Sequence, residues 1–84
     1  MLTFDFETEA IEANPIFTPP RPVGVSIKVD NEPSKYWAWG HPTGNNCSWE
    51  QGKKELLQAL RAHPDWVAHN SPFEAAVLRK WFKV

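Results

Sequence analysis

Hydrophobic and polar residues alternate at the start of the chain. Between residues 2 and 8, Phe4 and Phe6 fall on one face of an extended segment. Asp5 and Glu7 fall on the other face, because successive side chains of a strand point in opposite directions. This alternation predicts a half-buried β-strand. It also places two carboxylates on one face, roughly 7 Å apart along the strand.

The region that follows is predicted to continue as a β-meander. Residues 9–21 contain three prolines, and a fourth stands at position 22, so this stretch is expected to be a loop. Apolar residues alternate again over residues 23–29, turn formers fill residues 30–34, and an aromatic strand follows at residues 36–39. Together with the first strand, this hairpin gives three antiparallel strands.

The second half of the chain has helical periodicity. Ser48 and Gln51 have the spacing of a capping box, and Pro64 prevents the helix from continuing. Residues 66–68 are then expected to form a short buried strand, which the crossover through the helix lays parallel to the first strand. The apolar stripe of this helix consists of Trp49, Leu56, Leu57 and Leu60.

A second helix is predicted from its start signals. Ser71 stands at the N-cap, Pro72 at the first helical position, and Glu74 three residues after the cap. The predicted fold class is therefore α/β: a three-stranded antiparallel meander, one parallel crossover strand and two helices. The apolar stripe of the second helix consists of Phe73, Ala76, Val77 and Trp81.

Composition narrows the class of protein. The 84 residues are enough for one small domain. A net charge of -1 gives no basic surface of the kind that dominates non-specific nucleic-acid binding, so metals and local contacts would have to hold a nucleic acid. Cys47 is the single cysteine, and no transmembrane run or signal peptide is apparent. We therefore expect a soluble, cytoplasmic protein with no membrane partner.

Three carboxylates are candidate metal ligands. Without cations, Asp5 and Glu7 would repel one another and would be desolvated beside a packed core without a partner. Because the first strand and the strand ending at Ala68 are expected to be neighbours, Glu74 would reach the same face. Carboxylate oxygens suit Mg²⁺ or Mn²⁺. The alternatives are a solvent-facing strand for the first two residues and a capping-box role with Ser71 for Glu74.

Two motifs, in this order, resemble those of the DEDD family of 3′-5′ exonucleases. The first motif, D-x-E-T, is matched by Asp5-Phe6-Glu7-Thr8, and the second, N-x-x-[FY]-D, is similar to Asn70-Ser71-Pro72-Phe73-Glu74. Residues 22–27 and 36–42 are similar to the second and third strands of this domain in phage-like family A DNA polymerases. The resemblance implies that residues 1–84 form the N-terminal part of a ribonuclease H-like exonuclease domain with a proofreading function in DNA replication.

The resemblance also implies a role for each site residue. In this family, two divalent cations, Mg²⁺ or Mn²⁺, catalyse hydrolysis of the phosphodiester at the 3′ end of single-stranded DNA. Asp5 would bridge both cations, Glu7 would bind one of them, and Glu74 would be the next ligand. The residues implied to lie at the substrate end are Thr8, Asn70 and Phe73, the last either near the terminal nucleotide or packed behind the site.

The chain departs from the family in two places. Glu74 stands where most members have Asp, and no third motif, Y-x-x-x-D or H-x-x-x-x-D, follows Trp81. That motif supplies a final carboxylate and the group that orients the attacking water. We therefore expect the chain alone to be weak or inactive unless a separate polymerase or exonuclease chain, or a homodimer, completes the site. The alternatives are a non-catalytic module that dimerises or pairs with a polymerase chain through its sheet edge, and an RNase T-like exonuclease fragment.

Overall fold

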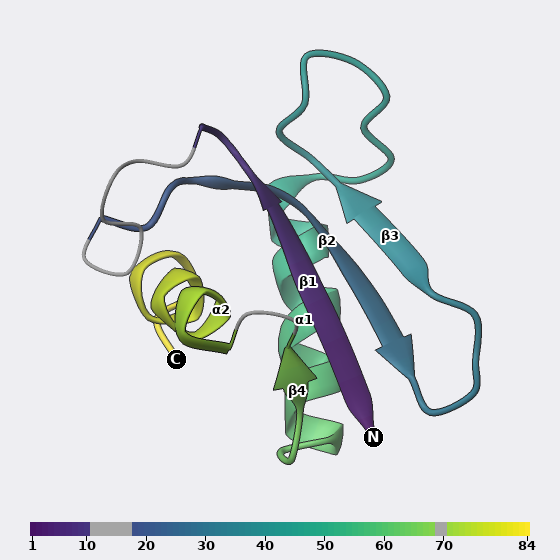
Figure 1. Ribbon diagram of the computed structural model, residues 1–84. Coiled ribbons are helices and arrows are strands. Elements are labelled where there is room, and N and C mark those ends of the chain that lie inside the picture. The colour runs from purple at the N-terminus through teal and green to yellow at the C-terminus, as the bar shows by residue number, and fades with distance from the viewer. Residues whose placement is uncertain (11–17, 69–70) are drawn as a thin grey trace.

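A computed structural model describes residues 1–10, 18–68 and 71–84 (Figure 1). The predicted loop at residues 9–21 falls largely outside these ranges. No helix within them is long and apolar enough to cross a membrane. The elements are β1 (Leu2–Thr8), β2 (Pro22–Val29), β3 (Lys35–Ala38), α1 (Trp49–Ala62), β4 (Val67–Ala68), α2 (Ser71–Val77) and a π-helical turn, η1 (Leu78–Phe82).

The four strands form one mixed sheet in the order β3-β2-β1-β4. β2 pairs antiparallel with both β1 and β3, so the predicted meander is confirmed. β4 pairs parallel with β1, with Thr3 opposite Val67 and Phe4 opposite Ala68. The predicted crossover is therefore confirmed as well, and the molecule is a small α/β protein.

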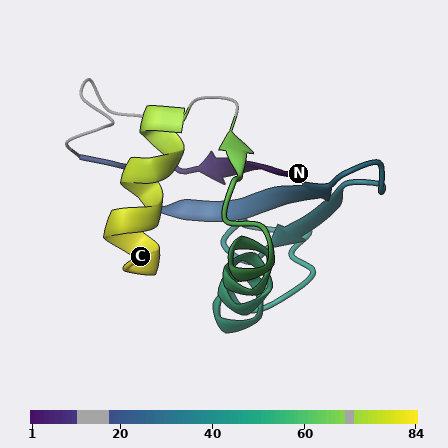
Figure 2. The same ribbon diagram turned by 90° about the horizontal axis from the view of Figure 1, so that it is seen from below.

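The sheet has one covered face and one open face. Phe4 and Phe6 of β1 are buried in the core, together with Val25 and Ile27 of β2. Viewed from below, α1 lies on one side of the sheet, and α2 with η1 stands at the β1 margin and extends toward that same side (Figure 2). No described helix covers the opposite face, which carries the exposed side chain of Asp5.

Helix α1 begins as the sequence indicates. The Ser48 side chain accepts a hydrogen bond from the backbone N–H of Gln51 at 3.1 Å, and the helix ends at Ala62, two residues before Pro64. Leu56 is fully buried. Trp39, predicted to lie in the aromatic strand, instead follows the end of β3 and packs against Gly52 of α1.

Two features of the second half differ from the prediction. Val67, expected to be buried, is 45% exposed, because it pairs with Thr3 on the open face of a strand at the sheet edge. The last helix also changes from α- to π-helical geometry after Val77. Since a π-helical turn changes which residues face inward, Leu78 and Phe82 enter the core in addition to the predicted stripe.

Candidate carboxylate site

The first strand and the last helix meet through two acidic side chains. Asp5 is exposed on the open face of β1, opposite Ser26 of β2. Glu74 lies in the first turn of α2 and is only 1% exposed. The two carboxyl groups are within hydrogen-bond contact of each other. The fold therefore brings together two predicted site residues that lie near opposite ends of the chain.

Glu74 also completes the edge of the sheet. Its Oε2 accepts a hydrogen bond from the backbone N–H of Phe6 at 3.2 Å. An unpaired buried N–H is costly, and the Glu74 carboxylate is an acceptor for the N–H of Phe6. The side chain therefore links α2 to β1. The alternative capping-box role with Ser71 stays a prediction, because the Ser71 side chain lies outside the described part of the structure.

This environment changes the acidity of Glu74. The pKa of Glu74 is raised to about 7: burial raises it most, the hydrogen bond from the Phe6 N–H lowers it, and the charge and hydrogen bond of Asp5 also raise it. A hydrogen bond between two carboxyl groups requires one shared proton. Near neutral pH that proton is readily lost, and two adjacent carboxylates then offer hard oxygen ligands to a divalent cation. The residues present thus fit the chemistry of Mg²⁺ or Mn²⁺.

Glu7 lies on the open face but is engaged elsewhere. Its Oε2 accepts a hydrogen bond from the Tyr36 hydroxyl at 3.0 Å and lies 3.5 Å from Nε2 of His41. The Tyr36 oxygen and His41 Nε2 are themselves 2.7 Å apart. Burial, followed by the hydrogen bond to Glu7 and its charge, raises the pKa of Tyr36 to about 12. The phenol therefore stays protonated and holds the carboxylate.

Gly24 makes this contact between β1 and β3 possible. Gly24 lies opposite Glu7 in β2, and a Cβ built on it would come within 2.9 Å of the Tyr36 Cζ atom. The tyrosine ring occupies the space above the glycine to reach Glu7. Sequence reasoning did not find Tyr36 or His41. The available signal was a glycine in a strand pattern, which often marks a close approach of another group.

The remaining predicted site residues have different surroundings. The Thr8 hydroxyl donates a hydrogen bond to the carbonyl of Glu9 at 2.9 Å. Phe73 is 8% exposed and belongs to the core; its place relative to a substrate stays a prediction. Asn70 lies outside the described residues, as does its neighbour His69.

Glu7 therefore does not converge with the other two acids in the described structure. Within residues 1–10, 18–68 and 71–84, no group of three or more His, Cys, Asp or Glu side chains is arranged to hold a metal ion. The acidic centre consists of the Asp5–Glu74 pair, with Glu7 next along the same strand face. A cation bound by Asp5 and Glu74 would gain Glu7 as a ligand only if Glu7 gave up its hydrogen bond with Tyr36.

Comparison of the chain with protein-family models, with curated proteins and with solved structures finds no significant match.

Proposed function

We propose that this chain is the N-terminal part of a ribonuclease H-like 3′-5′ exonuclease domain of the DEDD type, with a proofreading role beside a phage-like family A DNA polymerase. The observation that supports the proposal is the contact between Asp5 and Glu74. These residues belong to the two sequence motifs that resemble the family. In support of this, β1, which carries the first motif, pairs in parallel with β4, which precedes the second motif; shared metal binding would require the two motifs to lie close together.

The chain's own residues have distinct tasks in this proposal. Asp5 and Glu74 would hold Mg²⁺ or Mn²⁺, with Glu7 as a further ligand; the bound cations would neutralise charge on the phosphodiester and activate the attacking water. The Phe6 N–H orients Glu74. Tyr36 holds Glu7. The substrate would be a single-stranded DNA 3′ end approaching the open face near Thr8.

Full activity would require residues that correspond to the third motif, which residues 1–84 do not contain. A separate polymerase or exonuclease chain, or a homodimer, is a candidate source of that motif. Without it, residues 1–84 are expected to be weak or inactive as a nuclease. An RNase T-like exonuclease would share the same two motifs and the same Asp5–Glu74 pair, and differs in the motif that completes it.

Metal binding provides the first test. Calorimetric titration of the purified chain with Mn²⁺ at a pH above 7 should show binding that Asp5→Asn and Glu74→Gln each weaken by about tenfold or more, because each removes one anionic ligand. Glu32→Gln is the matched control, since it removes an exposed carboxylate in the β2–β3 turn. Equal Mn²⁺ affinity in all four proteins, or no binding to any of them, would refute the proposed site.

Nuclease assays provide the second test. We expect little or no shortening of 5′-labelled single-stranded DNA by the chain with Mn²⁺, and 3′-5′ shortening when a chain that supplies the third motif is added. Asp5→Asn should abolish the restored activity. Robust degradation by the chain alone, lost in Asp5→Asn, would support the nuclease assignment and contradict the expected inactivity.

A non-catalytic interaction module is the second candidate. The observation in its favour is the β4 edge, where Val67 is 45% exposed. Trp66, which precedes β4, lines a hollow of about 410 Å³ together with mainly apolar side chains of α1, α2 and η1. A partner strand or a second copy that pairs there would make oligomerisation independent of metal and of Asp5, and sensitive to Val67→Lys. Sedimentation of these variants separates the two candidates.

A further inference from the structure

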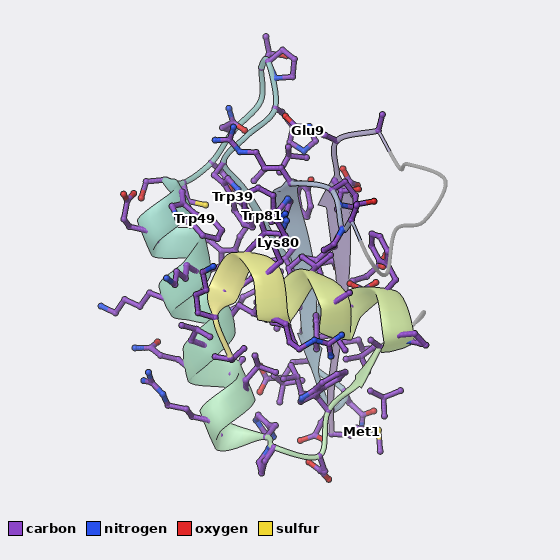
Figure 3. The ribbon with its side chains drawn as sticks, turned by 90° about the vertical axis from the view of Figure 1, so that its left-hand side faces the viewer. Met1, Glu9, Trp39, Trp49, Lys80 and Trp81 are labelled. Atoms are coloured by element: carbon purple, nitrogen blue, oxygen red, sulfur yellow. The ribbon has the colours of Figure 1, made fainter. Side chains whose placement is uncertain are left out.

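Three tryptophans and three cationic side chains surround a groove at the end of the sheet where β1 stops and β2 begins. Figure 3 shows Trp39, Trp49, Lys80 and Trp81 close together beside α1 and η1. The hollow has a volume of about 430 Å³, within the range of ligand-binding pockets. We call it the tryptophan groove; its lining consists of Arg21, Pro22, Trp39, Trp49, Lys80, Trp81 and Lys83.

The rings of the groove are held in place. The indole N–H of Trp39 donates to the carbonyl of Pro22 at 2.9 Å, and that of Trp81 donates to the carbonyl of Pro19 at 3.1 Å. The ring centroids of Trp39 and Trp49 lie 5.3 Å apart. All three indoles are half-buried. They are therefore fixed aromatic surfaces that retain contact with solvent, and little side-chain entropy is left to lose when a ligand stacks on them.

The cations of the groove have no acidic partner among the described residues. Arg21, Lys80 and Lys83 are exposed, and none of them forms an ion pair with a carboxylate in the part of the chain that the structure describes. Lys80 Nζ lies 5.6 Å from the centroid of the Trp81 ring. The protein carries a net charge of -1, so this positive charge is a local feature. It lies next to the aromatic rings.

We propose that the tryptophan groove binds single-stranded nucleic acid, with bases stacked on the indoles and phosphates beside the cations. Each nucleotide offers one flat ring system and one negative charge, which is the combination that the groove complements. An acidic peptide offers the charge without a regular series of rings. A smaller hollow of about 270 Å³ shares Arg21, Lys80 and Trp81 with the groove but is also lined by the acidic residue Glu9. The contacts with nucleic acid are therefore assigned to the tryptophan groove itself.

The groove is separate from the carboxylate pair. Trp49 and Trp81 come from α1 and η1, on the helix side of the sheet, whereas Asp5 lies on the open face. Binding in the groove requires neither a metal ion nor the nuclease assignment. The two sites can thus fail independently, and EDTA distinguishes them.

The test measures binding of a fluorescein-labelled oligothymidylate of about 12 nucleotides to the protein in EDTA. Binding is monitored by the fluorescence anisotropy of the label and by quenching of the protein's tryptophan fluorescence. We expect binding that weakens with salt. Lys80→Gln/Lys83→Gln should weaken it by about tenfold and reduce the slope of log K against log salt by about 1.4, because two phosphate contacts are lost. Trp81→Leu should weaken it by about tenfold through lost stacking. Lys54→Gln, an exposed lysine of α1 outside the groove, should change nothing.

Several results would overturn the proposal. These are no binding in EDTA at low salt, equal binding by the Lys80→Gln/Lys83→Gln double variant, or binding that requires Mn²⁺ and disappears in Asp5→Asn. If polyglutamate displaces the labelled oligonucleotide as well as unlabelled oligonucleotide does, the groove recognises negative charge alone. The proposed ligand would then be an acidic peptide and not a nucleic acid. Since the lysines are exposed, the double variant should fold normally, and circular dichroism checks this.

Discussion

At the residue scale, the buried carboxyl of Glu74 makes stability depend on pH. Its pKa is raised from 4.5 to about 7 in the folded state, so between these values the folded state binds more protons than the unfolded state. Stability therefore falls as pH rises. In buffer with EDTA, we expect a loss on the order of 2–3 kcal/mol of unfolding free energy between about pH 5 and about pH 8, measured by urea denaturation.

Glu74→Gln is the matched variant for this prediction. The amide oxygen still accepts from the Phe6 N–H and the amide group donates to Asp5, so the variant mimics the protonated acid. We expect stability close to that of the original chain at about pH 5 and a nearly flat profile up to about pH 8. An unchanged pH dependence in Glu74→Gln would assign the effect to another group.

A second residue-scale prediction concerns Gly24. Gly24→Ala places a methyl group within 2.9 Å of the Tyr36 Cζ atom, so the ring must move away from Glu7. We expect a cost of about 1–3 kcal/mol in unfolding free energy. The same substitution in a Tyr36→Ala background should cost clearly less, and the difference in a double-mutant cycle measures the clash. Equal costs in the two backgrounds would show that the ring is not what the methyl group meets.

The sequence predicted the faces of these residues but not their partners. The alternation in β1 was sufficient to place Asp5 and Glu7 on one face and the phenylalanines in the core. The contact of Glu7 with Tyr36 depends on the register of two strands and on the space above one glycine. The alternation of residues along a single strand gives no information about the register between strands or about the space above the glycine.

At the element scale, helix α1 contains a residue of low helix propensity, Gly52, at a position where a neighbouring ring leaves no space for a larger side chain. Replacing an interior glycine by alanine ordinarily stabilises a helix by about 1 kcal/mol. A Cβ on Gly52, however, would lie 2.5 Å from Cε3 of Trp39. We expect Gly52→Ala to destabilise the protein by about 1–3 kcal/mol in urea denaturation. A stabilising effect would mean that Trp39 moves aside at little cost.

The start of α1 and the end of η1 differ in how far the sequence determines them. The cap at Ser48 is a local hydrogen bond to a residue three positions away, so the residues that predict it are close together in the sequence. The π-helical turn that buries Leu78 and Phe82 depends on packing, since the Phe82 ring contacts Phe6 and Trp49. Local propensity does not contain those contacts, and the predicted apolar stripe therefore missed both residues.

At the scale of the whole molecule, the rules for connecting strands and helices predicted more of the structure than the amino-acid composition did. The parallel placement of β4 beside β1 follows from the crossover through α1 and was predicted. The tryptophan groove was not, because Arg21, Trp39, Trp49 and Trp81 come from separate segments. A net charge close to zero also concealed the local cluster of cations.

The last prediction joins the two ends of the chain. A cation held by Asp5 and Glu74 would link β1 to α2, and it would stabilise the folded state because the unfolded chain does not hold these residues together. At about pH 8, where Glu74 is ionised, free Mn²⁺ at ten times its dissociation constant should add about 1.4 kcal/mol. For a domain of this size that raises Tm by about 5–10 °C in a calorimetric scan.

Asp5→Asn separates this effect from general screening of charge. The variant keeps the shape of the side chain and loses one ligand charge, so its Tm should respond little to Mn²⁺. If Tm rises equally in the variant, the cation binds elsewhere; Glu7 with His41, whose nearest atoms are 3.5 Å apart, is then the first place to substitute. If Tm does not rise in the original chain, the acidic pair acts only as a hydrogen-bonded link between β1 and α2, and the nuclease proposal loses its metal site.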